Sequence, residues 1–313
     1  LFLYVLVVAF SGIVEMTIKI AYIKTRCEYG SKPIFKKTKD NRGILLSLIK
    51  YSIWAAIASI CSRFIISMNQ NILGIFAGTL QITFFAVGCQ IEGSVWQFSN
   101  ALDGMFMPIL SKMNVYNASS DDYTRMMIKV GRIQLLLIGL ILIGFICLGN
   151  NFINQIWIKN ESISYTTSYW VAFFLILPAF FTYTHQIGKS TLLVKGKNKY
   201  YAFGMIISAV LSTALCFLFC AFMPQSAAIL SALGICVAKM LGLVIYMSFC
   251  YKKYGDINIL TFYLKCHVRY IPVAAIVLAI GLMLDYFLPS SFLYFAIKVI
   301  LIVILYIVLS WLI

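Results

Sequence analysis

Residues 125–153 read RMMIKVGRIQLLLIGLILIGFICLGNNFI. The first eight residues include Arg125, Lys129 and Arg132, and the 21 residues that follow carry no charge. An apolar run of about 20 residues is long enough to cross about 30 Å of hydrocarbon as a helix. Basic residues that flank such a helix favour the cytoplasmic side. This stretch therefore predicts a membrane-spanning helix that starts at the cytoplasmic face.

The rest of the chain repeats this pattern. Of the 313 residues, 62% are hydrophobic and 11% are charged, whereas a soluble domain has about 25% charged residues. Only helices or closed barrels satisfy every backbone polar group in lipid, and runs this long and continuous are typical of helices. We predict an all-α polytopic membrane protein with about nine transmembrane helices. The expected spans are residues 1–23, 46–68, 75–110, 133–153, 167–186, 203–222, 227–250, 271–288 and 292–313.

Basic residues are sorted among the eight connections between these spans. Every second connection is strongly basic, and the intervening connections contain a single basic residue, Lys159. This alternation predicts that the basic connections face the cytoplasm and that the first span runs from outside to inside. The basic residues are Lys24, Arg26, Lys32, Lys36, Lys37, Lys39 and Arg42 in the first connection; Lys112, Arg125, Lys129 and Arg132 in the third; Lys189, Lys195, Lys197 and Lys199 in the fifth; and Lys252, Lys253, Lys265 and Arg269 in the seventh.

The net charge of +15 reflects the basic residues of these connections, which are predicted to lie on one side of the membrane. Because the charge lies neither on one helix nor along one stripe, we expect the basic connections to contact membrane lipids and not nucleic acid.

The nine cysteines are odd in number, contain no CxxC pair and fall mostly in apolar runs, which predicts small buried thiols. The chain starts and stops inside apolar runs, so we expect a piece of a longer protein that lacks an N-terminal part.

The third apolar run, residues 75–110, has one polar side. At about 100° per residue, Gln81, Glu92 and Asp103 are offset by about 20° from one to the next, and Trp96 and Asn100 fall within the same sector, about 100° wide. Charges at bilayer depth are costly and usually face protein or water. The stripe therefore predicts a helix with one side in a polar cavity; the alternative is that these groups only join helices.

Charged residues in other spans are candidates for the same cavity. Arg63 lies near the outer end of its span, where it either lines the cavity or extends to the interface. Lys239 lies mid-span, at a depth about 7 Å from that of Glu92. A long lysine on a tilted helix would close this gap, and the sequence leaves open whether the two residues pair. Glu15 and Lys19 are spaced as an intrahelical ion pair. We expect Lys50 and Lys298 either to extend to an interface or to lie nearer a helix end than the predicted bounds suggest.

The sequence contains no complete catalytic or metal-binding motif. Gly188-Lys189-Ser190-Thr191 resembles the end of a phosphate-binding loop, but Tyr183 stands where that loop needs glycine. His185 and His267 have no metal-ligand spacing. No nucleophile elbow or Cys/His cluster occurs, so we expect no enzyme, catalytic residue, metal or cofactor. One local motif has a structural meaning. An N-cap and first helical turn are predicted at Ser119, Ser120, Asp121 and Asp122, and they lead an interfacial helix into the fourth span.

Three stretches carry a resemblance to a known family. They are Asn71-Ile-Leu-Gly-Ile-Phe-Ala-Gly78 after a long span, Phe106-Met-Pro-Ile-Leu-Ser-Lys-Met113, and Leu192-Leu-Val-Lys-Gly-Lys-Asn-Lys-Tyr-Tyr-Ala202 in a basic connection. Their order and spacing resemble the later part of a polysaccharide (O-antigen repeat unit) flippase of the Wzx class. That class shares a superfamily with MATE exporters and the lipid II flippase. Two departures, at residues 67–70 and 223–228, leave the coupling-ion residues open.

The resemblance implies a two-lobe transporter of 12–14 helices whose N-terminal lobe is mostly missing here. Residues 1–24 would be the last helix of that lobe and 25–45 the cytoplasmic interlobe linker. Residues 46–250 would form the C-terminal six-helix lobe, and 251–313 a cytoplasmic loop with two extra transmembrane helices.

The resemblance also implies a function: flipping of a polyprenyl-pyrophosphate-linked oligosaccharide across the bacterial cytoplasmic (inner) membrane by alternating access. Arg63, Lys239, Trp96 and Asn100 would bind this substrate, and Glu92 and Asp103 would couple its movement to a cation, Na⁺ or H⁺. Two rivals remain. A cation-coupled multidrug exporter would have mainly acidic and aromatic cavity groups, and a polysaccharide polymerase or ligase would have a large basic outer loop.

Overall fold

The computed structural model describes residues 2–26, 41–100, 105–158, 163–289 and 291–311, and these residues are helical with short connections and no strand. They separate into two units, residues 1–49 and 50–313. Within the described residues, seven helices are long and apolar enough to cross a membrane, which supports an integral membrane protein. The predicted spans 1–23 and 75–110, which both include residues outside this description, are not among these seven. The seven lie within residues 48–76, 120–157, 166–184, 198–222, 224–254, 259–287 and 292–310.

The first unit contains α1 (Phe2–Arg26) and the start of α2 (Asn41–Phe76). Glu15 and Lys19 form the expected intrahelical ion pair, with 2.5 Å between Lys19 Nζ and Glu15 Oε1. Most of the predicted linker, residues 25–45, lies outside the described residues, and the predicted boundary at residue 250 stays a prediction.

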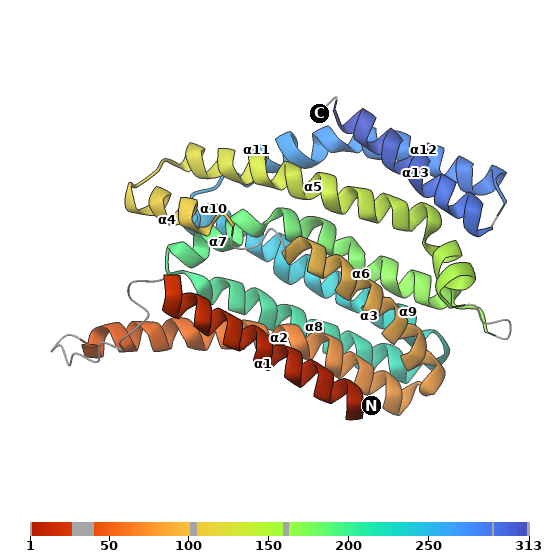
Figure 1. The fold of residues 1–313 in the computed structure, drawn as a ribbon, viewed down its shortest axis with the longest axis horizontal. Coiled ribbons are helices and arrows are strands. Elements are labelled where there is room, and N and C mark those ends of the chain that lie inside the picture. The colour runs from red at the N-terminus through yellow and green to blue at the C-terminus, as the bar shows by residue number, and fades with distance from the viewer. Residues whose placement is uncertain (1, 27–40, 101–104, 159–162, 290, 312–313) are drawn as a thin grey trace. The chain divides into compact units, whose positions relative to one another are not determined.

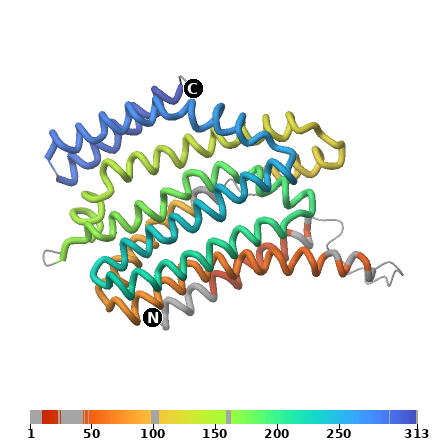
Figure 2. Tube along the Cα trace, turned by 180° about the vertical axis from the view of Figure 1, so that it is seen from behind, coloured from red at the N-terminus to blue at the C-terminus, as the bar shows by residue number. Residues whose placement is uncertain are grey.

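The second unit is a stack of long helices that lie side by side (Figures 1 and 2). Helix α8 packs on α9, α9 on α6, α6 on α5, and α5 on both α12 and α13, while α3 packs on α6 and α9. The elements after α2 are α3 (Thr79–Asn100), α4 (Met107–Val115), α5 (Ser120–Asn151), η1 (Phe152–Trp157), α6 (Thr166–Thr184), α7 (Gln186–Val194), α8 (Asn198–Phe222), η2 (Pro224–Ser226), α9 (Ala227–Lys239), η3 (Met240–Ile245), α10 (Tyr246–Tyr254), α11 (Ile259–Tyr263), η4 (Leu264–Val268), α12 (Arg269–Phe287) and α13 (Phe292–Ser310).

Local sequence signals set several helix ends. The Ser119 side chain and the Asp122 carboxylate form a capping box, and α5 then continues without a break to Asn151, so the predicted interfacial helix and fourth span are one helix. Gly196 has a φ of 69°, and the Lys197 N–H donates to the Leu192 carbonyl at 2.8 Å, which ends α7 in a left-handed cap. This cap gives a physical reason for the Leu192–Gly196 spacing.

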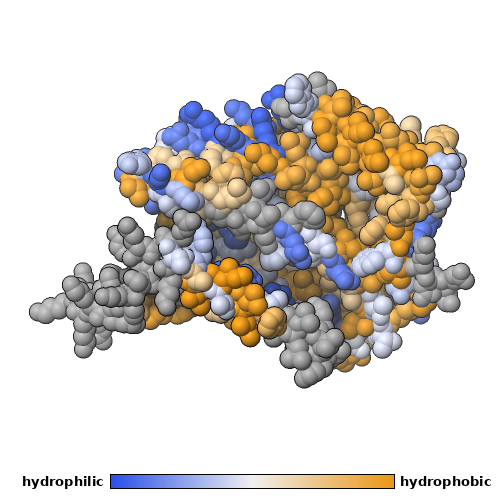
Figure 3. Space-filling view, viewed as in Figure 1, coloured by the Kyte–Doolittle hydropathy of each residue, from blue (hydrophilic) through white to orange (hydrophobic). Residues whose placement is uncertain are grey.

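Hydrophobic side chains cover much of the surface. Figure 3 shows them gathered over α12, α13 and the adjoining part of α5, whereas hydrophilic side chains gather near α4 and the start of α5. On α13, for example, Phe292, Ile300 and Val308 are all more than half exposed. Such an apolar surface is expected where lipid is the solvent. The eight described cysteines are free and mostly buried, as predicted.

Candidate functional site

A cavity of about 320 Å³ lies within the second unit. Helices α2, α3, α6, α7, α8, α9 and α10, together with η3, contribute side chains to its wall. Four residues singled out from the sequence line it: Arg63, Glu92, Trp96 and Lys239. The other lining residues are Ser62, Ile65, Ile66, Ser67, Gly93, Ala179, Thr182, Tyr183, Gln186, Lys189, Tyr201, Met205, Leu243 and Tyr251.

Glu92 and Lys239 form an ion pair across the cavity wall. Lys239 Nζ lies 3.2 Å from Glu92 Oε1, and the two side chains are 17% and 9% exposed, respectively. This answers the question that the sequence left open, since α3 and α9 pack directly on each other. A buried charge is costly without a partner, and here each side chain places an opposite charge beside the other.

The helix that carries Lys239 changes its winding at that residue. Lys239 is the last residue of α9, and the π-helical turn η3 follows immediately. π-helical turns leave part of the backbone without its usual bonding pattern and are frequent at functional sites. Here the Ser208 hydroxyl donates to the Ala238 carbonyl at 3.1 Å. The π-helical turn places Leu243, and α10 beyond it places Tyr251, on the same cavity as Lys239.

Two glycines allow α8 and η3 to approach closely at this point. A Cβ added to Gly242 would lie 2.3 Å from Ser208 Oγ and 2.5 Å from the Gly204 carbonyl oxygen, and a Cβ on Gly204 would lie 2.7 Å from the Gly242 carbonyl oxygen. Small residues four positions apart commonly permit such close contact between membrane helices. The close packing fixes the position of the helix segment that follows Lys239.

Lys189 is a cavity cation that the sequence reasoning missed. It was counted among the basic cytoplasmic residues of the fifth connection, but it lies on α7 and lines the cavity, with Nζ 5.0 Å from the centre of the Tyr201 ring. Among the described lining residues, Arg63, Lys189 and Lys239 are cationic and Glu92 is acidic, so the cavity carries two net positive charges. Trp96, Tyr183, Tyr201 and Tyr251 add aromatic surface.

The polar stripe of α3 divides between two roles. Glu92 and Trp96 line the cavity, but Gln81 does not: its side-chain amide donates to the Gln225 carbonyl at 2.5 Å and accepts from the Ala228 N–H at 3.1 Å. Gln81 therefore caps the start of α9. The side chain of Asn100 and the whole of Asp103 lie outside the part of the chain that the structure describes.

The two histidines lie near each other in an aromatic cluster. His185 Nε2 lies 2.8 Å from Tyr263 Oη, and the His267 ring stacks on Phe181. Burial, and to a lesser extent the neighbouring His267, lowers the pKa of His185 to about 3, so the ring is neutral at physiological pH. Within the described residues, no group of three or more His, Cys, Asp or Glu side chains could hold a metal ion.

The expectation that Lys298 extends to an interface is wrong. Its side chain is 2% exposed, and Nζ lies 2.8 Å from Asp285 Oδ1. Helices α12 and α13 pack together, which brings a carboxylate that hydropathy alone did not single out beside the lysine. Their mutual attraction offsets the cost of burying the lysine ammonium.

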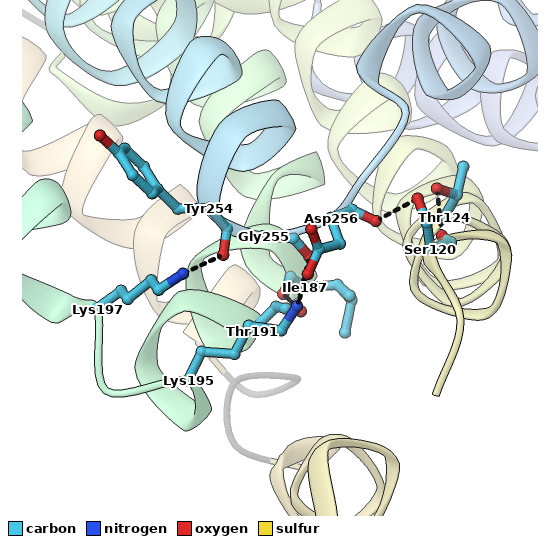
Figure 4. Close-up of polar contacts among 9 residues, drawn as sticks. All are labelled: Ser120, Thr124, Ile187, Thr191, Lys195, Lys197, Tyr254, Gly255 and Asp256. Atoms are coloured by element: carbon cyan, nitrogen blue, oxygen red, sulfur yellow. Dashed lines mark hydrogen bonds and ion pairs between the residues drawn. The ribbon is translucent and has the colours of Figure 1, made fainter. Parts of the chain in front are cut away.

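Polar contacts join three of the predicted cytoplasmic connections (Figure 4). The Lys195 ammonium lies 2.6 Å from Asp256 Oδ2 and also donates to the Gly255 carbonyl, while Lys197 donates to the Tyr254 carbonyl. The Ser120 hydroxyl donates to the Asp256 carbonyl at 2.7 Å. These bonds link the ends of α5, α7, α8 and α10.

Comparison of the chain with protein-family models, with curated proteins and with solved structures found no match. The chemical character of the site therefore rests on its own residues: a polar cavity with a buried ion pair, two further cations and four aromatic rings.

Proposed function

We propose that the protein moves a polyprenyl-pyrophosphate-linked oligosaccharide across the bacterial cytoplasmic membrane. The observation that carries this proposal is the net positive charge of the aromatic-lined cavity, where Arg63 and Lys189 add two cations beyond the Glu92–Lys239 pair. A pyrophosphate and its sugars cannot cross hydrocarbon unaided. A cavity of this composition offers both groups a polar environment within the stack of apolar helices.

Each part of the cargo has a suitable partner in the cavity wall. The guanidinium of Arg63 can form two parallel hydrogen bonds to a phosphate, and the ammonium of Lys189 acts as a point charge. Trp96, which is 49% exposed, and the partly buried Tyr183 offer flat faces with polar edges, which suit sugar rings. The charge of Lys239 is already balanced by Glu92, so we assign pyrophosphate binding chiefly to Arg63, with Lys189 on the same cavity wall.

Alternating access would move residues 50–313 as one body against other helices of the transporter. The bonds between the Lys195–Lys197 turn, the Tyr254–Asp256 segment and Ser120 support such movement, because they tie the ends of four helices together (Figure 4). A coupling cation or proton would act at Glu92, where it competes with Lys239 for the carboxylate.

Complementation tests the transport role. In a strain that lacks the chromosomal copy, we expect Arg63→Ala and Lys189→Ala each to reduce surface polysaccharide at least about tenfold, because each removes a charged hydrogen-bond donor worth about 1.5–3 kcal/mol. The matched control is Lys199→Ala, which removes a lysine near the start of α8 that does not line the cavity. Immunoblots of membranes check that every variant is present. Wild-type polysaccharide in both cavity variants would overturn the proposal.

The same strains distinguish a multidrug exporter. An exporter of cationic drugs needs a carboxylate that the drug can reach, and the one described acidic residue of the cavity wall, Glu92, is paired with Lys239. We therefore expect ethidium accumulation to be the same in cells with and without the protein. Protein-dependent ethidium export, with no change in surface polysaccharide, would favour the exporter instead.

A further inference from the structure

A second polar cluster joins α5, α12 and α13, away from the cavity described above. Lys298 Nζ contacts Asp285 Oδ1 at 2.8 Å and the Asp285 carbonyl oxygen at 3.4 Å, and the Asn151 side-chain amide donates to the same Oδ1 at 2.7 Å. A lysine ammonium has three N–H donors. Its contacts among the described residues all go to Asp285, so the ammonium can donate to a further acceptor.

A cavity has Lys298 in its wall. This cavity of about 400 Å³ is lined by four polar residues, Asn151, Gln155, Ser291 and Lys298, and by Phe292 and Phe295 among its apolar ones. Asn151 uses its amide N–H for Asp285, which leaves its amide oxygen for hydrogen bonds within this space. Gln155 and Ser291 can each donate and accept. The wall therefore suits a small group that bears several oxygens.

An apolar groove of about 290 Å³ lies beside this polar cavity and shares Phe295 with it. Helices α5 and α13, which lie side by side in Figure 1, form its walls, with Gly144 on α5 and Val299 and Val303 on α13. From Phe295 to Val303 the groove follows about 12 Å of α13. A Cβ on Gly144 would meet no atom within 4 Å, so the groove is open there.

We propose that the polar cavity and the groove together bind one phospholipid of the bilayer. Its phosphate accepts from Lys298, its headgroup bonds to Asn151, Gln155 and Ser291, and one acyl chain lies in the groove along α13. The two spaces match the two ends of a phospholipid. The cavity has four polar residues in its wall for the headgroup, the groove has apolar residues for an acyl chain, and the two spaces meet at Phe295. Asn151 and Ser291 lie at helix ends expected to face outward, so the lipid comes from the outer leaflet. This site is separate from the proposed transport cavity and does not depend on its function.

Native mass spectrometry of the purified protein tests the site, with phosphatidylethanolamine as the added probe. We expect one tightly held lipid per wild-type chain. Gly144→Leu fills the groove without touching the Asp285–Lys298 pair, and we expect it to weaken lipid binding at least tenfold. Lys298→Gln removes the phosphate donor and has the same expected effect. The matched control is Val210→Phe, which enlarges an exposed apolar residue on α8 and leaves binding unchanged.

Two results would overturn the proposal. One is equal lipid binding by the wild type, Gly144→Leu and Lys298→Gln. The other is a competition result. If undecaprenyl phosphate at an equal concentration displaces phosphatidylethanolamine from the wild type but not from Gly144→Leu, the site selects the prenyl carrier over a bilayer lipid. Lys298→Gln removes one partner of the buried ion pair and can therefore fail to fold. Gly144→Leu retains this ion pair, so it tests the site even if Lys298→Gln does not fold.

Discussion

Two buried lysine–carboxylate pairs lie in the second unit, and their surroundings differ. Glu92–Lys239 lies on a cavity with two more cations and four aromatic rings, whereas Asp285–Lys298 lies among α5, α12 and α13 beside phenylalanines and an apolar groove. In the first pair the carboxylate is the more buried partner, at 9% exposure; in the second it is the lysine, at 2%. Each pair therefore buries one partner more deeply than the other, and we expect removal of the less buried partner to be costly in both pairs.

Removal of the carboxylate of the second pair should have the largest effect on stability. Asp285→Ala leaves the buried ammonium of Lys298 without its partner, and we expect the free energy of unfolding to fall by about 3–5 kcal/mol. Thermal unfolding of the purified variant in detergent measures this loss. The double variant Asp285→Leu/Lys298→Met should recover most of it, since no buried charge remains. An Asp285→Ala protein as stable as the wild type would show that Lys298 has another way to offset its charge.

The first pair should show a smaller stability effect and a larger effect on transport. Lys239→Met leaves Glu92 beside a polar cavity that also contains Arg63, so we expect a loss of about 1–3 kcal/mol in the same unfolding measurement. Glu92→Gln/Lys239→Met should regain that stability, yet both variants should fail in complementation. Full transport by the stable double variant would assign the pair a purely structural role.

Glycine substitutions compare the packing around the two regions. Gly242→Ala places a Cβ within 2.5 Å of Ser208 and Gly204 atoms, so we expect it to cost about 1–3 kcal/mol of unfolding free energy through overpacking. Gly144→Ala, in the open groove, meets no atom within 4 Å and should change stability by less than about 0.5 kcal/mol. Equal melting temperatures for the two variants would contradict the close approach of η3 to α8.

A pH series tests the burial of His185, whose ring contacts residues of both regions. Its ring contacts Tyr251, which lines the cavity, and Phe262, in the core around α5 and α12. Because the folded pKa is about 3 and the ordinary value is 6.5, the unfolded chain binds the proton first as pH falls. The stability from neutral His185 is complete above pH 6.5 and is lost at up to about 1.4 kcal/mol per pH unit towards pH 3.

We expect wild-type stability to fall by about 2 kcal/mol between pH 6.5 and pH 5 through this residue. His185→Gln should be less stable at neutral pH but should lose less on acidification. Any pH dependence that remains in His185→Gln belongs to other titratable groups. An identical slope in wild type and variant would show that His185 is not buried in its neutral form.

Much of the local structure follows from sequence patterns. Apolar length predicted most of the spans, and Ser119 with Asp122 predicted the start of α5. Helical spacing placed Glu92 and Trp96 on one side of α3, whereas the predicted depths left a gap of about 7 Å between Lys239 and Glu92 and left their pairing open. The same spacing failed for Gln81, because the start of α9 offered backbone partners that no pattern within α3 contains.

The sequence by itself determined most of the long helices and which connections are basic, and it predicted the order of polar residues along each helix, because apolar length and 1.5 Å per residue fix positions along one axis. Only the tertiary structure decided lateral neighbours. It paired Glu92 with Lys239, brought Lys189 from a basic connection into the cavity wall and buried Lys298 against Asp285. Helix packing depends on side-chain shape across different segments, and it therefore determines the contacts between helices that hydropathy leaves open.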